Sequence, residues 1–505
     1  MCFINYNIKY YNKSSMLKII KEKEIILYLI LSILFAFTIQ QFPFFKGNSL
    51  HLLHAIKDFD TNKLQNDWVA NQTNHLPVFT YLNNIFIQVF SIKILHVIHF
   101  SLLVICPFYI FLVCKNEFQN LNKTSLLLIW FSIFIIIYHE HSFFGGLAGQ
   151  DIINEGYQPA SFGVLFYCGI YLFLIRKYFL SILLICLSAS FHPSYVLHSG
   201  LLFFGFSFYL ILAREFKTLL KLLTYYIILI SPITLYIFLN FLLIDKELIQ
   251  MGQNILVERI PHHALIENWF SYKDFFSILI YLISLLIIHK NKKIFVPLTI
   301  FGISSILLSI LQFITENYTL ALAFPWRASV VLIPLSSMII ISFLLNKFFS
   351  NKNNINLFSM SLFIIVFLFF FAKNHFIKNA NQKFYSKLEL VSKINVNYDS
   401  IERVLIPINI PYIRMNTGLP IFIDWKHHAF KYDEIIMWKK RINLAQKFYE
   451  TSIFEQQREI LMNINKIDFI SHILIEKKEL NPKCLNLIKH EKFALINAST
   501  CYELN

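Results

Sequence analysis

The strongest constraint on this chain is its repeated alternation of long apolar runs with short polar segments. A helix needs about 20 apolar residues to cross a bilayer, and about eleven runs in this sequence reach or approach that length. The predicted spans are Ile25–Phe42, Ile94–Val113, Ser125–Tyr138, Phe162–Ile175, Tyr178–Phe191, Tyr195–Ala213, Leu219–Ile244, Phe275–His289, Ile294–Ile314, Ala328–Asn346 and Leu357–Ala372. We therefore expect an α-helical polytopic membrane protein with about 11 transmembrane helices.

The distribution of Lys and Arg between these spans predicts an orientation. Alternate loops are short and hold about a dozen Lys and Arg, whereas the intervening loops are much longer and hold fewer. Because cytoplasmic loops are enriched in Lys and Arg, we expect a cytoplasmic N-terminus and, after an odd number of spans, an outer C-terminus. The short run Ser125–Tyr138 decides this result, because losing it alone would invert every later loop. The expected location is the inner (plasma) membrane of a bacterium.

The net charge of +15 does not indicate a nucleic-acid partner. The basic residues are scattered over the N-terminus, the inner loops and the tail, and they form no basic face interleaved with aromatic side chains. Membrane lipids are the expected surroundings. The sequence does not indicate an oligomeric state.

The composition changes near residue 373, which divides the chain into a multi-span domain (1–372) and a C-terminal domain (373–505). Alternating apolar segments predict a small α/β domain in the tail. Its expected elements are strands at Arg403–Asn409, Pro420–Trp425 and Asp468–Ile475, and a helix at Tyr432–Tyr449. Cys484 and Cys501 can pair if this domain lies outside the cytoplasm. Before the second span, Pro77–Phe90 is amphipathic, and we expect a helix at the outer interface.

The first outer loop supplies the candidate catalytic acids Asp58, Asp60 and Asp67. Carboxylates at positions i and i+2 can hold a divalent cation such as Mg²⁺ or Mn²⁺, or one can act as a general base while the other orients it. The alternative is that Asp58 and Asp60 are solvated loop residues that cap a helix.

The second outer loop contains Glu140 and Asp151, together with three of the twelve glycines in the chain. Glycines allow a close approach of the backbone to a ligand, so both acids are candidate substrate-binding residues. A polar helix end followed by a turn explains the same pattern.

Candidate anion-binding residues occur in three further outer segments: His192, then Arg259 with His262 and His263, and finally Arg327. Arg offers a bidentate fork for phosphate, and His adds a donor that titrates near neutrality. The alternative roles are a Pro-Ser turn for His192 and headgroup anchoring for the arginines beside Trp. In the tail, Arg414 and Lys426 flank a polar loop between two predicted strands, which is a frequent place for ligand binding. Packing of this loop on the outer loops is the other explanation.

These motifs together resemble the GT-C superfamily of membrane glycosyltransferases. The quoted segments are Asn66–Trp68 (NDW), His192–Tyr195 (HPSY), Arg259–His263 (RIPHH), Phe324–Arg327 (FPWR) and Arg414–Lys426 (RMNTGLPIFIDWK). The resemblance covers the whole chain in layout but only short motifs in residues. It implies an acid in the first outer loop, which Asp58, Asp60 or Asp67 would supply, and a lipid-linked sugar donor of the polyprenyl-phosphate type.

The expected function is therefore transfer of a sugar from such a donor to an acceptor at the outer face of the membrane. Two other functions are compatible with the sequence, a lipid or glycolipid flippase and a non-catalytic protein of envelope assembly. An ion-coupled transporter is disfavoured, because the predicted spans hold almost no charged residues at mid-depth and show no internal repeat.

Overall fold

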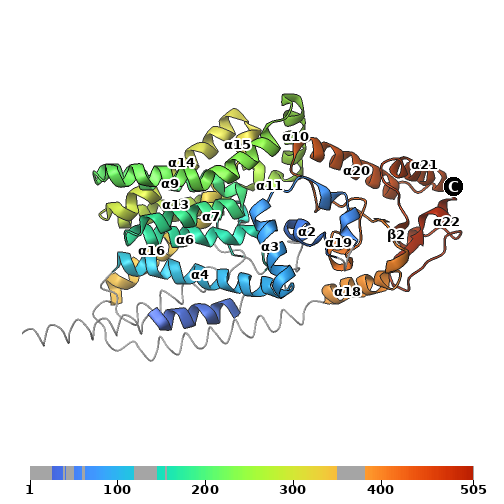
Figure 1. Cartoon of the computed structure of the whole chain (residues 1–505), viewed down its shortest axis with the longest axis horizontal. Helices are drawn as coiled ribbons and strands as arrows, with labels where there is room; N and C mark the ends of the chain where they lie inside the picture. The colour runs from blue at the N-terminus through green and yellow to red at the C-terminus, as the bar shows by residue number, and fades with distance from the viewer. Residues whose placement is uncertain are drawn as a thin grey trace, which may run out of the picture.

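The computed structural model describes residues 25–37, 40, 50–59, 63–118, 145–153, 156–349 and 382–503. The predicted spans Ser125–Tyr138 and Leu357–Ala372 lie outside the described residues, as do Asp60 and Glu140. The described part is elongated, with a bundle of apolar helices at one end and the C-terminal tail at the other (Figure 1).

The described apolar helices coincide in position with the other nine predicted spans. They are Ile25–Phe37, α4 (Ile94–Glu117), α6 (Val164–Leu174), α7 (Tyr178–Phe191), α8 (Val196–Leu212), α9 (Phe216–Ile237) continued by the π-helix η7 (Phe238–Leu242), α13 (Tyr272–Ile288), α14 (Lys292–Thr315) and α16 (Ser329–Phe349). Five helical stretches are long and apolar enough to cross a membrane: Ile94–Glu117, Pro193–Leu212, Phe216–Leu242, Lys292–Thr315 and Tyr318–Lys347. The described residues thus support a polytopic helical membrane protein without confirming the full number of eleven spans.

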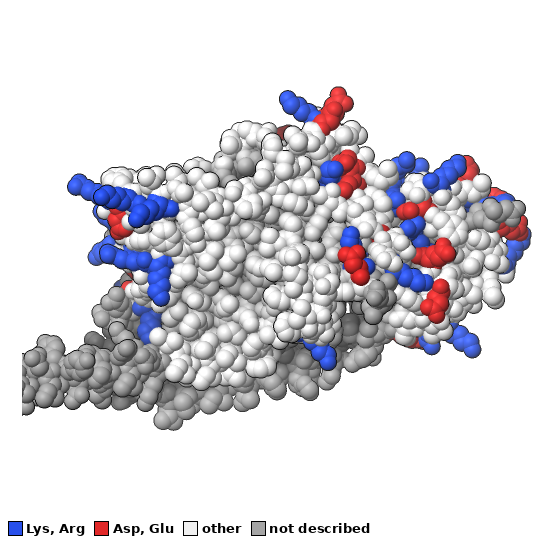
Figure 2. Space-filling view, viewed as in Figure 1, with Lys and Arg blue, Asp and Glu red and all other residues white. Residues whose placement is uncertain are grey.

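Charged side chains are sorted along the long axis of the molecule. In the view of Figure 2, Lys and Arg gather at the free end of the helix bundle, a broad white belt follows, and both signs of charge cover the tail. A belt without charges is what a hydrocarbon core requires of the surface that faces it. The surface therefore agrees with a helix bundle that spans a membrane.

Short helices cover the end of the bundle that faces the tail. They are α2 (Leu50–Ile56), η2 (Leu64–Asn66), η3 (Val69–Asn71), α3 (Pro77–Phe90), η4 (Leu147–Gly149), η5 (Pro159–Gly163), η6 (Pro193–Tyr195), α10 (Lys246–Arg259), α11 (Pro261–Ala264), α12 (Ile266–Trp269), α15 (Tyr318–Leu322) and η8 (Pro325–Ala328). The helix α3 has the bounds predicted from its amphipathic pattern, and it buries Phe79, Asn83 and Ile87.

The tail contains five helices and a small sheet within its described residues. Its elements are α18 (Gln382–Asn395), η10 (Tyr398–Ser400), β1 (Val404–Leu405), α19 (Tyr412–Thr417), α20 (Tyr432–Glu450), α21 (Phe454–Asn465), β2 (His472–Glu476), η11 (Lys477–Glu479), β3 (Phe493–Asn497) and α22 (Ala498–Tyr502). The strand order is β1-β2-β3. Strand β1 is parallel to β2, and β2 is antiparallel to β3.

The tail agrees with its sequence-based prediction in class but differs in two strands. The predicted helix at Tyr432–Tyr449 is α20, and the predicted strand at Asp468–Ile475 overlaps β2. The first predicted strand is reduced to β1, and Pro420–Trp425 forms a single bridge, Val404 to Ile421, before the chain turns into the bundle interface. Cys484 and Cys501 form a disulfide, as the sequence allowed.

Candidate functional site

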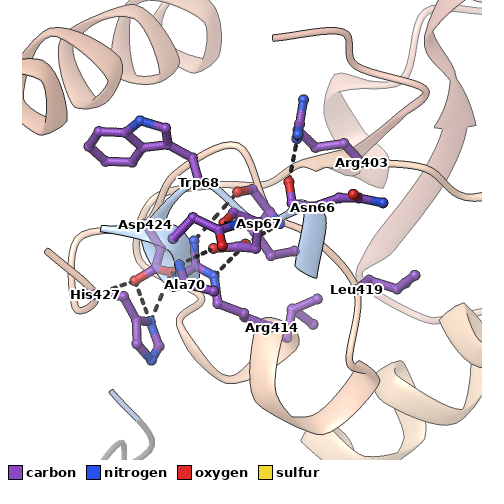
Figure 3. Close-up of polar contacts among 12 residues, drawn as sticks. Asn66, Asp67, Trp68, Ala70, Arg403, Arg414, Leu419, Asp424 and His427 are labelled. Atoms are coloured by element: carbon purple, nitrogen blue, oxygen red, sulfur yellow. Dashed lines mark hydrogen bonds and ion pairs between the residues drawn. The ribbon is translucent and has the colours of Figure 1, made fainter. Parts of the chain in front are cut away.

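A buried ion-pair network joins the loop before the second predicted span to the tail (Figure 3). Arg414 donates from Nε to Oδ2 of Asp67 at 2.8 Å, and its Nη1 binds Asp424. All three side chains are fully buried. Asp67 also accepts from the backbone N–H groups of Ala70 and Ile421. Two carboxylates thus share one guanidinium across the boundary between the two parts of the chain.

Further contacts surround this network and complete what we call the docking seam, the contact of residues 63–71 with residues 398–441. The Arg403 guanidinium donates to the carbonyl of Asn66 at 2.7 Å, and the Arg441 guanidinium lies over the Trp68 ring, 4.4 Å from its centroid. The Lys63 N–H donates to the carbonyl of Gly418. Every residue of the Asn66–Trp68 motif therefore contacts the tail, so this motif has a clear structural role.

The seam holds the following loop of the tail in a fixed conformation. Oδ1 of Asp424 accepts from the backbone N–H of His427 at 2.8 Å and from its ring Nδ1 at 2.9 Å. Burial alone would raise the pKa of Asp424, but Arg414 and His427 lower it to about 2. The indole N–H of Trp438 donates to the carbonyl of His427. This loop carries Lys426 and His428 to the side that faces the helix bundle.

Arg259, Arg327, Lys426, His192 and His263 form what we call the basic cluster. Members of the cluster are close enough to influence one another electrostatically. The positive charges of Arg327 and Lys426 disfavour protonation of His263, and that of Arg327 also disfavours protonation of His192. Burial, together with its cationic neighbours, lowers the pKa of His263 to about 3. The cluster brings together residues from four separate segments of the chain.

Each arginine of the cluster is oriented by a neighbour. Arg327 donates from Nη1 to the Ser194 hydroxyl at 2.7 Å, and Nδ1 of His192 lies 2.8 Å from the same oxygen. Arg259 donates from Nε to the carbonyl of Trp425 at 2.9 Å and lies over its ring. Both guanidiniums keep further N–H groups that donate to no hydrogen-bond acceptor among the described residues. These groups have the geometry to bind a phosphate oxygen.

An apolar cavity of about 520 Å³ lies beside the cluster. The helices α13, α14 and α16 line it with side chains such as Ile278, Phe313 and Leu332, and Trp269 and Trp326 belong to the same lining. The indole N–H of Trp326 donates to the carbonyl of His263 at 3.0 Å. The cavity and the basic cluster therefore share the short helix η8 as a common wall.

The structure distributes the candidate residues unevenly. His192, Arg259, His263, Arg327 and Lys426 converge, with the exposed His262 at the edge, next to His263. Asp67 and Arg414 lie in the docking seam, where their burial and pairing favour a structural role. Asp58 is exposed just after α2, and Asp151 is exposed beside Gly145. Asp60 and Glu140 remain predictions, because they lie outside the described residues.

The predicted divalent cation has no complete site within the described ranges. No group of three or more His, Cys, Asp or Glu side chains there is arranged to hold a metal ion. Of the Asp58–Asp60 pair, only the exposed Asp58 is described, so this pair stays a prediction for Mg²⁺ or Mn²⁺.

Sequence reasoning assigned no role to three residues near the cluster. His51 in α2 and His75 before α3 have ring centroids 5.8 Å apart, and Phe430 of the tail stacks on His75 at 3.6 Å. Asp424 lies inside the Arg414–Lys426 motif, where the sequence alone indicates no role for it. A row of histidines in the first outer loop was visible in the sequence, but their meeting with the tail was not.

Comparison with known proteins gives little further guidance. No protein-family model matches the chain, and no curated protein matches it. Among solved structures, the crystal structure of the Archaeoglobus fulgidus oligosaccharyltransferase in complex with Zn and sulfate is similar to this chain at 11% sequence identity and a TM-score of 0.45. The similarity covers 90% of this chain and 68% of that one. At this identity and TM-score, the similarity assigns neither a family nor an activity.

Proposed function

We propose that this chain is a membrane glycosyltransferase that takes a sugar from a lipid-phosphate donor of the polyprenyl type and transfers it at the outer face of the membrane. The outer location is supported by the sorting of Lys and Arg along the molecule and by the disulfide Cys484–Cys501, since disulfides persist in oxidising compartments. The acceptor and the sugar are left open.

The observation that carries this proposal is the arrangement of three consecutive residues in η8. Trp326 and Ala328 line the apolar cavity, whereas Arg327 between them donates to Ser194 in the basic cluster. Successive residues of η8 thus face the apolar cavity and the basic cluster, so that the two lie on opposite sides of this one short helix. A ligand with an apolar chain and a phosphate matches both compartments at once.

The charge balance of the cluster supports an anionic ligand. Arg259, Arg327 and Lys426 contribute three positive charges, and Asp424, the acid that acts on Arg259 and Lys426, is already bound by Arg414. Unneutralised cations in a partly buried place repel one another and favour a bound anion. A phosphate group supplies both the charge and the acceptor oxygens.

In the proposed reaction, a carboxylate takes the proton of the acceptor hydroxyl, whose oxygen then attacks C1 of the sugar. The bond from C1 to the phosphate oxygen breaks, and its electron pair leaves on the lipid phosphate, where the arginines stabilise the charge. The exposed Asp58, with Asp60, is the proposed source of the base, since Asp67 is held by Arg414.

The test is mass spectrometry of lipid-linked and surface glycans in cells with and without the gene, followed by complementation. We expect one glycan to disappear without the gene, to return with the unaltered chain, and to stay absent with Arg327→Gln. Lys439→Gln is the matched control, because Lys439 pairs with Glu258 on the exposed surface. Unchanged glycans in cells lacking the gene would contradict the proposal.

A further inference from the structure

Two half-buried histidines of the first outer loop lie beside the basic cluster, and each has one shielded ring nitrogen without a hydrogen-bond partner. Nδ1 of His51 and Nε2 of His75 are shielded from solvent and find no hydrogen-bond partner among the described residues. A buried polar atom without a partner costs about 1–3 kcal/mol. A catalytic or binding role is one of the reasons for which proteins retain such an atom.

The surroundings of this pair come from every neighbouring element and are almost entirely basic. The charged and titratable groups that act on His51 or His75 are His54 of the same helix, His192 of the α7–η6 turn, Arg327 of η8, and Lys426, His427 and His428 of the tail. Asp67, which acts on His54, and Asp424, which contacts His427, are both held by Arg414 in the docking seam.

Burial, reinforced by this basic field, keeps both imidazoles neutral in the free protein. Burial, and then the charge of Lys426 and nearby histidines, lowers the pKa of His51 to about 3. Burial and the proximity of His51 hold the pKa of His75 well below its ordinary value of 6.5. At neutral pH the pair therefore carries no charge despite its position between the two parts of the chain.

We infer that oxyanion binding at the basic cluster is coupled to proton uptake by His51 and His75. The inference rests on the proposed function for the location of the anion. Arg327 and Lys426 disfavour protonation of His51 directly, and an anion bound to them cancels that field. The anion also attracts a proton in its own right. Anion binding then favours protonation of the histidines, and protonation favours anion binding to the same extent, as thermodynamic linkage requires.

The sign of the pH dependence follows from this coupling. The imidazole pKa values are low in the free protein and are raised in the complex, so the complex holds more protons than the free protein. Binding therefore strengthens as the pH falls from 8 to 6. Each proton taken up strengthens binding by up to about tenfold per pH unit.

Sulfate is a suitable probe, because its charge does not change in this range and any proton taken up belongs to the protein. We would titrate sulfate into the full-length protein in detergent by calorimetry, in two buffers with different heats of ionisation. The difference between the two heats gives the number of protons taken up. For the unaltered protein we expect proton uptake at pH 7 and at least about tenfold tighter binding at pH 6 than at pH 8.

The double variant His51→Gln with His75→Gln should keep the affinity measured at pH 8 within about threefold and lose most of the proton uptake. His289→Gln, an exposed histidine at the inner end of α13, is the matched control and should change neither quantity. Sulfate binding with no proton uptake, or uptake that persists in the double variant, would overturn the inference while the proposed function stands. Absence of sulfate binding at every pH would overturn both.

Discussion

The docking seam and the basic cluster are built from the same two parts of the chain, yet they treat buried charge in opposite ways. In the seam, the guanidinium of Arg414 is matched by Asp67 and Asp424. In the cluster, Arg259 and Arg327 are oriented by a carbonyl and a hydroxyl, and Asp424, the acid that acts on Arg259, is already paired with Arg414. Matched charges hold the tail in place, whereas unmatched cations are suited to a ligand. The difference separates residues with matched charges, to which we assign a structural role, from the unmatched cations that we propose as the anion-binding residues.

The largest expected effect comes from breaking the seam. Arg414→Met leaves the two buried carboxylates of Asp67 and Asp424 without their shared guanidinium and should destabilise the docked tail by about 3–5 kcal/mol. Hydrogen exchange at residues 419–430, measured by mass spectrometry, should rise strongly. Arg458→Met, at a half-buried arginine near Glu455 and outside the seam, is the control and should leave the exchange of residues 419–430 unchanged. Protection equal to that of the unaltered chain would remove the structural role assigned to the seam.

A second change weakens the tail without touching either region. Cys484→Ser with Cys501→Ser opens a link between residues 17 positions apart and should cost about 3 kcal/mol of tail stability. Thermal unfolding followed by hydrogen exchange measures this loss. Sulfate affinity at a temperature where the tail is folded should stay unchanged, because the disulfide contacts no member of the cluster. A parallel loss of affinity would show that the cluster depends on the whole tail and not on the seam alone.

A third change tests the cluster itself. Arg259→Gln removes the cation and its hydrogen bond to the carbonyl of Trp425. Loss of a charge-assisted contact should weaken sulfate binding by about tenfold or more, with little change in the exchange of the seam. Glu258→Gln, at the adjacent exposed residue, provides the comparison. Equal affinity of the two variants would mean that Arg259 holds the tail and does not contact an anion.

The smallest effect on stability is expected at the exposed acid. Asp58→Asn should change the free energy of unfolding by less than about 0.5 kcal/mol, as for most surface substitutions. It should nevertheless abolish glycan formation in the complementation assay if Asp58 is the base. Asp60→Asn and Asp67→Asn complete the series, and full activity in all three variants would end the carboxylate mechanism.

The membrane part was predictable because its pattern is local. A run of about 20 apolar residues specifies a helix and its environment without reference to the rest of the chain. The amphipathic pattern of Pro77–Phe90 likewise gave the exact bounds of α3. The longer loops between the predicted spans also indicated that most candidate polar residues lie at one end of the helix bundle.

The partners of those polar residues were not predictable. Asp67 and Arg414 are 347 positions apart, and nothing near either residue in the sequence indicates which will be paired and buried. The sequence therefore grouped Asp67 with Asp58 as an acid of one loop, whereas the structure separates a buried residue from an exposed one. The tail strand predicted at Pro420–Trp425 differs for a related reason, because its residues turn to meet the bundle and do not extend the sheet.

The position of Lys426 near the end of the chain has a consequence for biosynthesis. Arg259 and Arg327 are translated and inserted well before Lys426 emerges, so a growing chain holds an incomplete cluster. The loop that carries Lys426 also needs Asp67, Arg414 and Asp424 in place before it is fixed. A chain that stops before residue 424 would lack Lys426 and therefore hold an incomplete basic cluster. The order of synthesis thus keeps the cluster incomplete until residues 414–426 have been made and have docked on residues 63–71.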